Sequence, residues 1–190
     1  MGLRRPILRD GSELRPALQG PRATLRTSMK LRPYRSSDFQ TLYEIDRSCF
    51  PPGIAYSREE LEQFVGHRTS ETWVAEEGDA IVGFLIADRE PGRVGHIVSI
   101  DVVAKCRRRG VGAKLMDAGE DWARRQGLEL VFLETAEDNN AAQAFYEARG
   151  YVKYEKLENY YADGTAAWVM VKWLKPSLRA QMTFPSSLLL

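Results

Sequence analysis

A carboxylate stands at the end of an apolar run in this 190-residue chain, where it could take a proton from a reacting group. In the stretch LELVFLET, Glu134 alternates with Leu130 and Phe132, so the three side chains are predicted on one face of a strand. An acid at a strand end can also turn outward into water. The residues alone leave both interpretations open.

Two more side chains could carry protons, His96 and Tyr146. His96 opens the run GHIVSIDV, where simple alternation predicts that it shares a face with Val98 and Ile100. Tyr146 is predicted just beside the core stripe of a helix, and the members of that stripe are Ala141, Ala144, Phe145 and Ala148. For both side chains, structural packing is the alternative interpretation.

A basic cluster directly before two glycines could hold an anion. The stretch AKCRRRGVGAKL contains three consecutive arginines and then Gly110, Val111 and Gly112. Apolar residues at helical spacing predict a helix from about residue 109 to 126, with Val111, Leu115, Ala118 and Trp122 on its core face. A helix N-terminus presents unpaired N–H groups and partial positive charge, and glycine lets a phosphate approach the backbone. A phosphorylated cofactor is therefore favoured over a solvated loop or a nucleic-acid contact.

Hydrophobic periodicity and turn residues predict the elements that position these groups. Met29 begins a short strand, and Ser37 or Asp38 is expected as the N-cap of the first helix. Ser57 and Glu60 form a capping box for a second helix. The later elements are a hairpin turning at residues 77–79, strand GHIVSIDVV, helix 109–126, strand LELVFLET, helix NNAAQAFYEAR, and strands YVKYEKL and AAWVMVKW. This order predicts an α/β fold with a mixed sheet of about six to seven strands flanked by about four helices, its parallel part within residues 95–150.

Composition excludes several classes of protein. The formal net charge is +1, which argues against a general nucleic-acid-binding surface. Two cysteines, Cys49 and Cys106, and two histidines, His67 and His96, give neither a metal-binding spacing nor a disulfide framework, so we expect no bound metal and a cytoplasmic location. No apolar run reaches the ~18 residues that cross a bilayer, and no membrane association is expected.

The chain is predicted to contain one folded domain with an extension at each end. Residues 1–28 are rich in Arg, Pro, Gly and Leu and are expected to be a disordered extension, with an Arg-rich targeting peptide as the alternative. Residues 29–174 would form the domain, and residues 175–190 a C-terminal tail.

The motifs also carry a family likeness. RRRGVGAKL resembles the acetyl-CoA signature Arg/Gln-x-x-Gly-x-Gly/Ala of the GNAT N-acetyltransferases, and LETAEDNNAAQAFYEARGY is similar to the segment that follows it in that superfamily. GHIVSIDV, FPPGIAYS and NYYADG narrow the resemblance to protein N-terminal acetyltransferases of the RimI and archaeal/eukaryotic N-alpha types. The likeness covers about residues 29–174 and implies the GNAT fold. It departs at Cys106, where an aromatic residue is usual, and at Asp101, where a small residue is usual.

The resemblance implies how the cosubstrate acetyl-CoA is held. Backbone groups of Ile100, Asp101 and Val102 would bind the acetyl and pantetheine portions, and Asn139 would contact the CoA arm. The residues of the turn would cradle the pyrophosphate: Arg108, Arg109, Gly110, Val111, Gly112 and Ala113.

It likewise implies the catalytic roles. Glu134 would act as base through a water, His96 would relay the proton, and Tyr146, lying against the cofactor, would protonate the CoA thiolate. The acceptor would lie in a narrow groove walled by aromatic residues on two segments, namely Phe50, Tyr56, Tyr160 and Tyr161, for which turn or core packing is the alternative.

The expected reaction is acetyl transfer to the α-amine of a protein or peptide N-terminus, by direct attack in a ternary complex; a RimI-like enzyme acting on a ribosomal-protein alanine is one form of it. A small-molecule amine or a lysine side chain as acceptor, and a non-catalytic CoA-binding module, are the alternatives. We expect a monomer or a weak homodimer.

Overall fold

The computed structural model describes residues 28–51 and 53–175. The predictions for residues 1–27 and 176–190 lie outside the described residues. The elements in chain order are β1 (Met29–Pro33), α1 (Phe39–Cys49), α2 (Arg58–Gly66), β2 (Glu71–Glu77), β3 (Ala80–Glu90), β4 (Val94–Val102), α3 (Val111–Arg125), β5 (Leu130–Ala136), α4 (Asn140–Ala148), β6 (Val152–Leu157) and β7 (Ala167–Trp173). This confirms the predicted order of helices and strands. No helix in the described ranges is long and apolar enough to cross a membrane.

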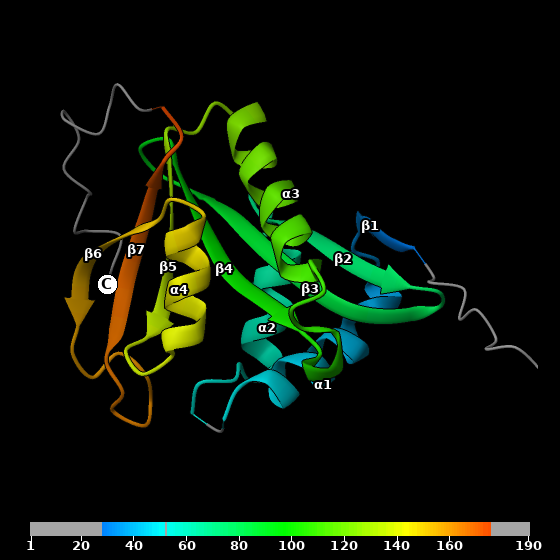
Figure 1. The fold of residues 1–190 in the computed structure, drawn as a ribbon. Coiled ribbons are helices and arrows are strands. Elements are labelled where there is room, and N and C mark those ends of the chain that lie inside the picture. Colours follow the sequence, from blue (N-terminus) through cyan, green and yellow to red (C-terminus); the bar gives the residue numbers. More distant parts are fainter. Residues whose placement is uncertain (1–27, 52, 176–190) are drawn as a thin grey trace, which may run out of the picture.

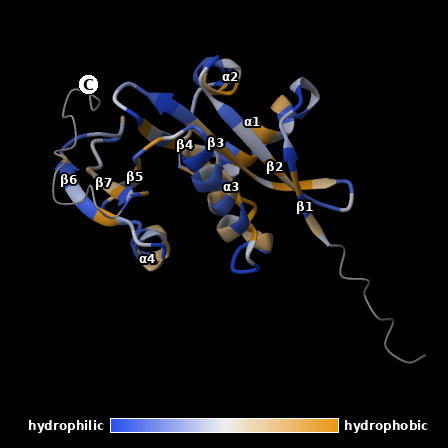
Figure 2. Cartoon of the chain, turned by 90° about the horizontal axis from the view of Figure 1, so that it is seen from above, coloured by the Kyte–Doolittle hydropathy of each residue, from blue (hydrophilic) through white to orange (hydrophobic). Residues whose placement is uncertain are grey.

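The seven strands form one sheet in the order β1-β2-β3-β4-β5-β7-β6 (Figure 1). β4 and β5 pair in parallel, and their neighbours pair antiparallel, as the prediction of a mixed sheet requires. Helices α1 and α2 cover one face of the sheet, and α3 and α4 cover the other (Figure 2). Each face has its own hydrophobic core, with Leu42 and Leu61 buried on the first and Leu115 and Met116 on the second.

The N-terminal caps of the first two helices follow different patterns. At α2 the predicted capping box is present, with Ser57 Oγ accepting from Glu60 N at 3.2 Å and Glu60 Oε2 accepting from Ser57 N at 2.8 Å. Asp38 occupies the N-cap position of α1, but its carboxylate makes no capping bond there. Instead it accepts from Arg35 N at 2.8 Å and from the Arg32 guanidinium at 2.6 and 2.9 Å.

A β-bulge in β4 changes which side chains share a face. Ile86 pairs with Ser99 and Ala87 pairs with Ile97, so Val98 is the extra residue. The expectation that His96 and Val98 share a face with Ile100 is therefore wrong. Ile97 and Ile100 both pack into the core under α3, which puts His96, the residue before Ile97, on the opposite face.

Helix α4 is rotated relative to the predicted core stripe. Ala141, Ala144 and Ala148 are exposed, whereas Gln143 and Tyr146 are buried, so the predicted stripe is wrong. The cause is polar: Gln143 Nε2 donates to the carbonyls of Ala136 and Glu137, each at 2.9 Å. Turning this amide inward ties α4 to the end of β5 and brings Tyr146 fully into the core.

Candidate active site

The two central parallel strands separate and leave a cavity between them. Residues 94–96 of β4 pair with residues 130–132 of β5, and the pairing ends there. Beyond that point the strands draw apart (Figure 1). Residues 97–102 and 133–136 line a cavity of about 710 Å³, which is also bounded by the start of α3, by α4 and by two loops. A cavity of this size suits a small-molecule substrate together with part of an acceptor.

Glu134 and His96 meet at the point where the strands part. Glu134 lines the cavity, and its Oε2 lies 2.8 Å from Nε2 of His96. The imidazole stacks on Phe132, with ring centroids 4.3 Å apart, and its Nδ1 lies 4.0 Å from Glu90 Oε1. Burial disfavours the imidazolium, but the charge of Glu134 and its hydrogen bond outweigh this, and the pKa of His96 is raised. A proton can therefore pass between the cavity and this partly buried pair.

Tyr146 reaches the same cavity from α4. Its ring packs between Phe145, at a centroid distance of 5.4 Å, and Tyr151, at 5.9 Å. Burial raises the pKa of Tyr146, and the negative charge of Asp101 raises it further. The phenol therefore stays protonated at neutral pH and is available as a proton donor.

The predicted anion turn forms one end of the cavity. Gly110, at φ 85°, precedes α3, and no atom lies within 4 Å of the position a Cβ would take there. The first backbone bond at this end of α3 runs from Lys114 N to Gly110 O, so the N–H groups of residues 111–113 precede the helical ladder. Arg108, Gly110, Gly112 and Ala113 line the cavity. This open, electropositive backbone fits a diphosphate.

Two residues of the predicted turn lie outside the cavity lining. Nη2 of Arg109 donates to both carboxylate oxygens of Glu77 on β2, at 2.9 and 3.0 Å, and Val111 is 1% exposed in the core under α3. Asn139 does line the cavity, but its Oδ1 caps α4 by accepting from Ala142 N at 3.1 Å. The backbone N–H of Val111 precedes the helical ladder, and the side-chain nitrogen of Asn139 is not the atom that caps α4. These two groups can therefore donate hydrogen bonds to a cosubstrate.

The four predicted acceptor-site aromatics line the same cavity. Phe50 and Tyr56 come from the α1–α2 loop, and Tyr160 and Tyr161 from the β6–β7 loop, beyond the end of β6. The loops are joined by a bond from Ala162 N to Gly53 O at 3.3 Å. Tyr160 is 43% exposed and stands at the mouth. Together the loops bound a narrow entrance.

Tyr56 also fixes the bulge of β4. Its hydroxyl donates to Val98 O at 3.0 Å, and its backbone N–H donates to Asp46 Oδ2 at 3.0 Å. Burial raises the pKa of Asp46 to about 6. Asp46 is not among the predicted site residues, although an acid four residues after Leu42, on the apolar face of a helix, is a usable signal.

Asp101 lies beside Asp46 on the same face of the sheet. Its carboxyl is 1% exposed and accepts from Ser99 Oγ at 2.8 Å. Burial raises the pKa of Asp101 to about 7, and the charge of Asp46 adds to the effect. The predicted role of Asp101 used its backbone, and the backbone does line the cavity wall together with Ile100 and Val102. Among the described residues, no group of three or more His, Cys, Asp or Glu could hold a metal ion.

The cavity, with its proton-carrying side chains and its open anion-binding turn, is a candidate active site, and comparison with known proteins gives the family. Residues 39–151 match the model of the acetyltransferase (GNAT) family. The chain belongs to that family and is an acetyl-CoA-dependent acyltransferase.

Two curated proteins and one solved structure illustrate what the chain is similar to. N-alpha-acetyltransferase 30 of Schizosaccharomyces pombe is 32% identical over 117 residues, 60% of this chain and 78% of that protein. N-alpha-acetyltransferase of Saccharolobus solfataricus is 29% identical over 157 residues, 75% of this chain and 91% of that protein. The solved structure of Ard1 from Thermoplasma volcanium superposes with a TM-score of 0.69 at 27% identity, covering 77% of this chain and 98% of that one.

Proposed function

We propose that this enzyme transfers the acetyl group of acetyl-CoA to the α-amine of a peptide or protein N-terminus, by direct attack in a ternary complex. The names of the relatives in S. pombe and S. solfataricus support an α-amine as acceptor. The observation that carries the proposal is the Glu134–His96 pair, with Oε2 and Nε2 2.8 Å apart. Glu134 lines the same cavity as the glycine turn before α3 and the four aromatic residues of the two loops.

Each end of the cavity has a separate task. The N–H groups at the start of α3, with Arg108 beside them, hold the diphosphate of the donor. The parted edge of β4 offers backbone groups of residues 100–102 to the donor's amide arm, because β5 no longer pairs with them. The thioester then lies between the strands, near Glu134 and Tyr146.

The acceptor enters as an extended chain end between the two loops. An α-amine has an unperturbed pKa near 8, so it is mostly protonated at neutral pH and must lose a proton before it can attack. Glu134, backed by His96, takes that proton, directly or through a water. The nitrogen attacks the thioester carbonyl, the N–C bond forms and the C–S bond breaks. The electron pair stays on sulfur, which takes the proton of the Tyr146 hydroxyl, and the new amide nitrogen releases its second proton to solvent.

A lysine side chain or a small amine is the competing acceptor. The joined loops favour a thin chain end, because Gly53 and Ala162 hold the two walls together across the entrance. A RimI-like preference for an N-terminal alanine, the cytoplasmic location and the monomeric or weakly dimeric state stay predictions.

The test is a panel of acceptors incubated with the full chain and acetyl-CoA. It contains peptides beginning with Ala, Ser or Met, the same peptides with a blocked N-terminus, free lysine and polyamines. Mass spectrometry is expected to find one added acetyl group on the open peptides and none on the blocked ones. Acetylation of blocked peptides, or of the small amines alone, contradicts the proposal.

A further inference from the structure

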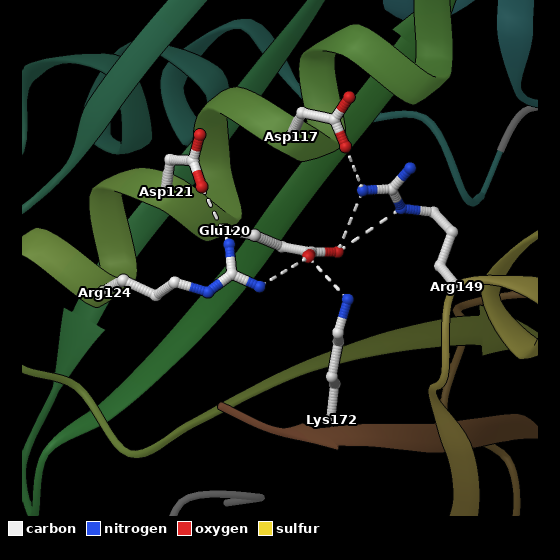
Figure 3. Close-up of polar contacts among 6 residues, drawn as sticks. All are labelled: Asp117, Glu120, Asp121, Arg124, Arg149 and Lys172. Atoms are coloured by element: carbon white, nitrogen blue, oxygen red, sulfur yellow. Dashed lines mark hydrogen bonds and ion pairs between the residues drawn. The ribbon is translucent and has the colours of Figure 1, made fainter. Parts of the chain in front are cut away.

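A buried carboxylate on α3 gathers positive charges from three elements (Figure 3). Glu120 is 2% exposed. Its Oε2 accepts from Lys172 Nζ on β7 at 2.5 Å and from Arg124 Nη2 on its own helix at 3.3 Å. Its Oε1 accepts from Nη2 and Nε of Arg149, just after α4, at 3.2 and 3.3 Å. Asp117, one turn earlier on α3, accepts from the same Arg149 guanidinium at 2.6 Å.

The first route from this cluster to the cavity runs through the backbone of α4. The N–H of Arg149 donates to the carbonyl of Tyr146 at 2.9 Å, and the N–H of Tyr151 donates to the same carbonyl at 3.1 Å. The residue whose guanidinium is held by Glu120 therefore also closes the last turn of α4. That turn carries the Tyr146 ring.

The second route runs through side chains. The Lys172 ammonium lies 5.6 Å from the ring centroid of Tyr151, a distance at which a cation is attracted to the ring. The Tyr151 ring in turn packs at 5.9 Å from the Tyr146 ring. Through Arg149 and Lys172, Glu120 is thus connected both to the backbone that carries Tyr146 and to the ring against which Tyr146 packs.

Helix α4 depends on such contacts for its orientation. It has nine residues, too few for a stable helix in isolation, and the side chains it buries are Gln143 and Tyr146. Gln143 fixes its first turn to the end of β5. The last turn, near Tyr146, is fixed by Arg149 on Glu120 and Asp117 of α3. Because α3 begins at the diphosphate turn, the same contact sets the distance between Tyr146 and the donor's anchoring point.

We infer that Glu120 is a positioning residue, which through Arg149 and Lys172 holds the Tyr146 hydroxyl where it can protonate the departing sulfur. This inference rests on the acid role of Tyr146 in the proposed function. The step is the one already given: the C–S bond breaks, the thiolate sulfur takes the phenolic proton, and the tyrosinate regains a proton from solvent.

The test is a double-mutant cycle on kcat with an acceptor peptide. Y146F keeps the ring and removes the proton donor, and E120Q keeps the shape of Glu120 and removes its charge. E120Q alone is expected to lower kcat about 10- to 100-fold, the loss typical of a catalytic group displaced by about 1 Å, with little change in KM for acetyl-CoA. In the Y146F background, E120Q is expected to change kcat less than about twofold, because there is no acid left to position.

Equal losses in both backgrounds, or no loss from E120Q, overturn the inference. A Y146F enzyme with native kcat overturns the acid role itself and this inference with it, while N-terminal acetylation by the native enzyme still stands as a separate result. D121N is the matched control: Asp121 lies beside Glu120 on α3 and pairs with Arg124 at 2.8 Å, without a partner on α4 or β7 in the described chain. Its kcat is expected to stay native.

E120Q leaves three cations around a neutral group and could prevent folding, so R149K provides a second arm of the cycle. Lysine keeps the positive charge beside Glu120 but loses the forked guanidinium that reaches both Glu120 and Asp117. R149K is expected to keep the native melting temperature. It is expected to lower kcat when Tyr146 is present and to leave kcat unchanged in the Y146F background. Equal kcat losses in both backgrounds, or native kcat for R149K, overturn the inference.

Discussion

Replacing Asp101 by asparagine should remove a defined part of the pH dependence of folding stability. Burial raises the pKa of Asp101 to about 7, from 3.8 for an ordinary aspartate. Between these two values the folded chain holds a proton that the unfolded chain has released. Stability therefore falls as pH rises through this range, the reverse of the usual behaviour of a salt-bridged carboxylate.

The size of the effect follows from the same difference. Roughly three pH units, at about 1.4 kcal/mol for each unit, give a loss of about 4 kcal/mol in the free energy of unfolding, of which about 3 kcal/mol falls between pH 5 and pH 8. Groups from both packed elements also act on this carboxyl: the charge of Asp46 on α1 raises its pKa, whereas Ser99 of β4, Cys49 of α1 and the charge of Arg107 lower it. Asparagine keeps the acceptor for Ser99 Oγ and cannot ionise.

The assay is urea unfolding of the native chain and D101N at pH 5 and pH 8. The fall in unfolding free energy between these pH values should be smaller in D101N by about 3 kcal/mol. E62Q, which removes an exposed carboxylate on α2, is the control and should keep the native pH dependence. An identical fall in D101N and the native chain would refute the reasoning that Asp101 is buried as a neutral acid.

Three other predictions concern the cavity. E134Q should lower kcat by about 10²- to 10⁴-fold, the range for a lost general base, while KM for acetyl-CoA stays native; steady-state kinetics at saturating acceptor measure both. In E134Q the pKa of His96 should fall, because the carboxylate charge that raises it is gone, and an NMR titration with an unchanged midpoint would contradict the assigned pair. G112A should keep or slightly raise the melting temperature, since an added Cβ meets Phe145 at an ordinary 3.6 Å, yet it should raise KM for acetyl-CoA by crowding the turn; an unchanged KM would place the diphosphate elsewhere.

The order of helices and strands could be predicted because each element carries a local signal. The capping box of Ser57 and Glu60, and the glycines that close α3 and α4, are short-range features that the backbone obeys directly. The parallel pair β4–β5 followed from the helix between the two strands.

Features that depend on partner strands or on distant charges could not be predicted in the same way. The bulge at Val98 is a property of the register between β3 and β4, and nothing in GHIVSIDV marks which residue is extra. Gln143 faces inward because its side-chain amide donates a hydrogen bond to the carbonyl of Ala136 at the end of β5. Glu120 is buried because Arg149 and Lys172, distant in sequence, converge on it.

Most predicted site residues do lie at one cavity, since they sit at the ends of elements that the fold brings together. The cavity is lined by Glu134, Tyr146 and Tyr56, and by Gly110 and Gly112 of the turn before α3. Arg109 does not line it, because its Nη2 donates to both carboxylate oxygens of Glu77 on β2, a partner that no local sequence pattern indicates.

Acetylation of an α-amine with Glu134 as the base is tested most directly with one peptide that offers both kinds of amine. This peptide has a free N-terminus and an internal lysine at the third position. After incubation with acetyl-CoA and the full chain, tandem mass spectrometry locates the acetyl group. With the native enzyme the acetyl group is expected on the α-nitrogen, and its rate of appearance is expected to fall with E134Q. Acetyl on the lysine ε-nitrogen, or α-acetylation by E134Q at the native rate, would contradict the proposed function.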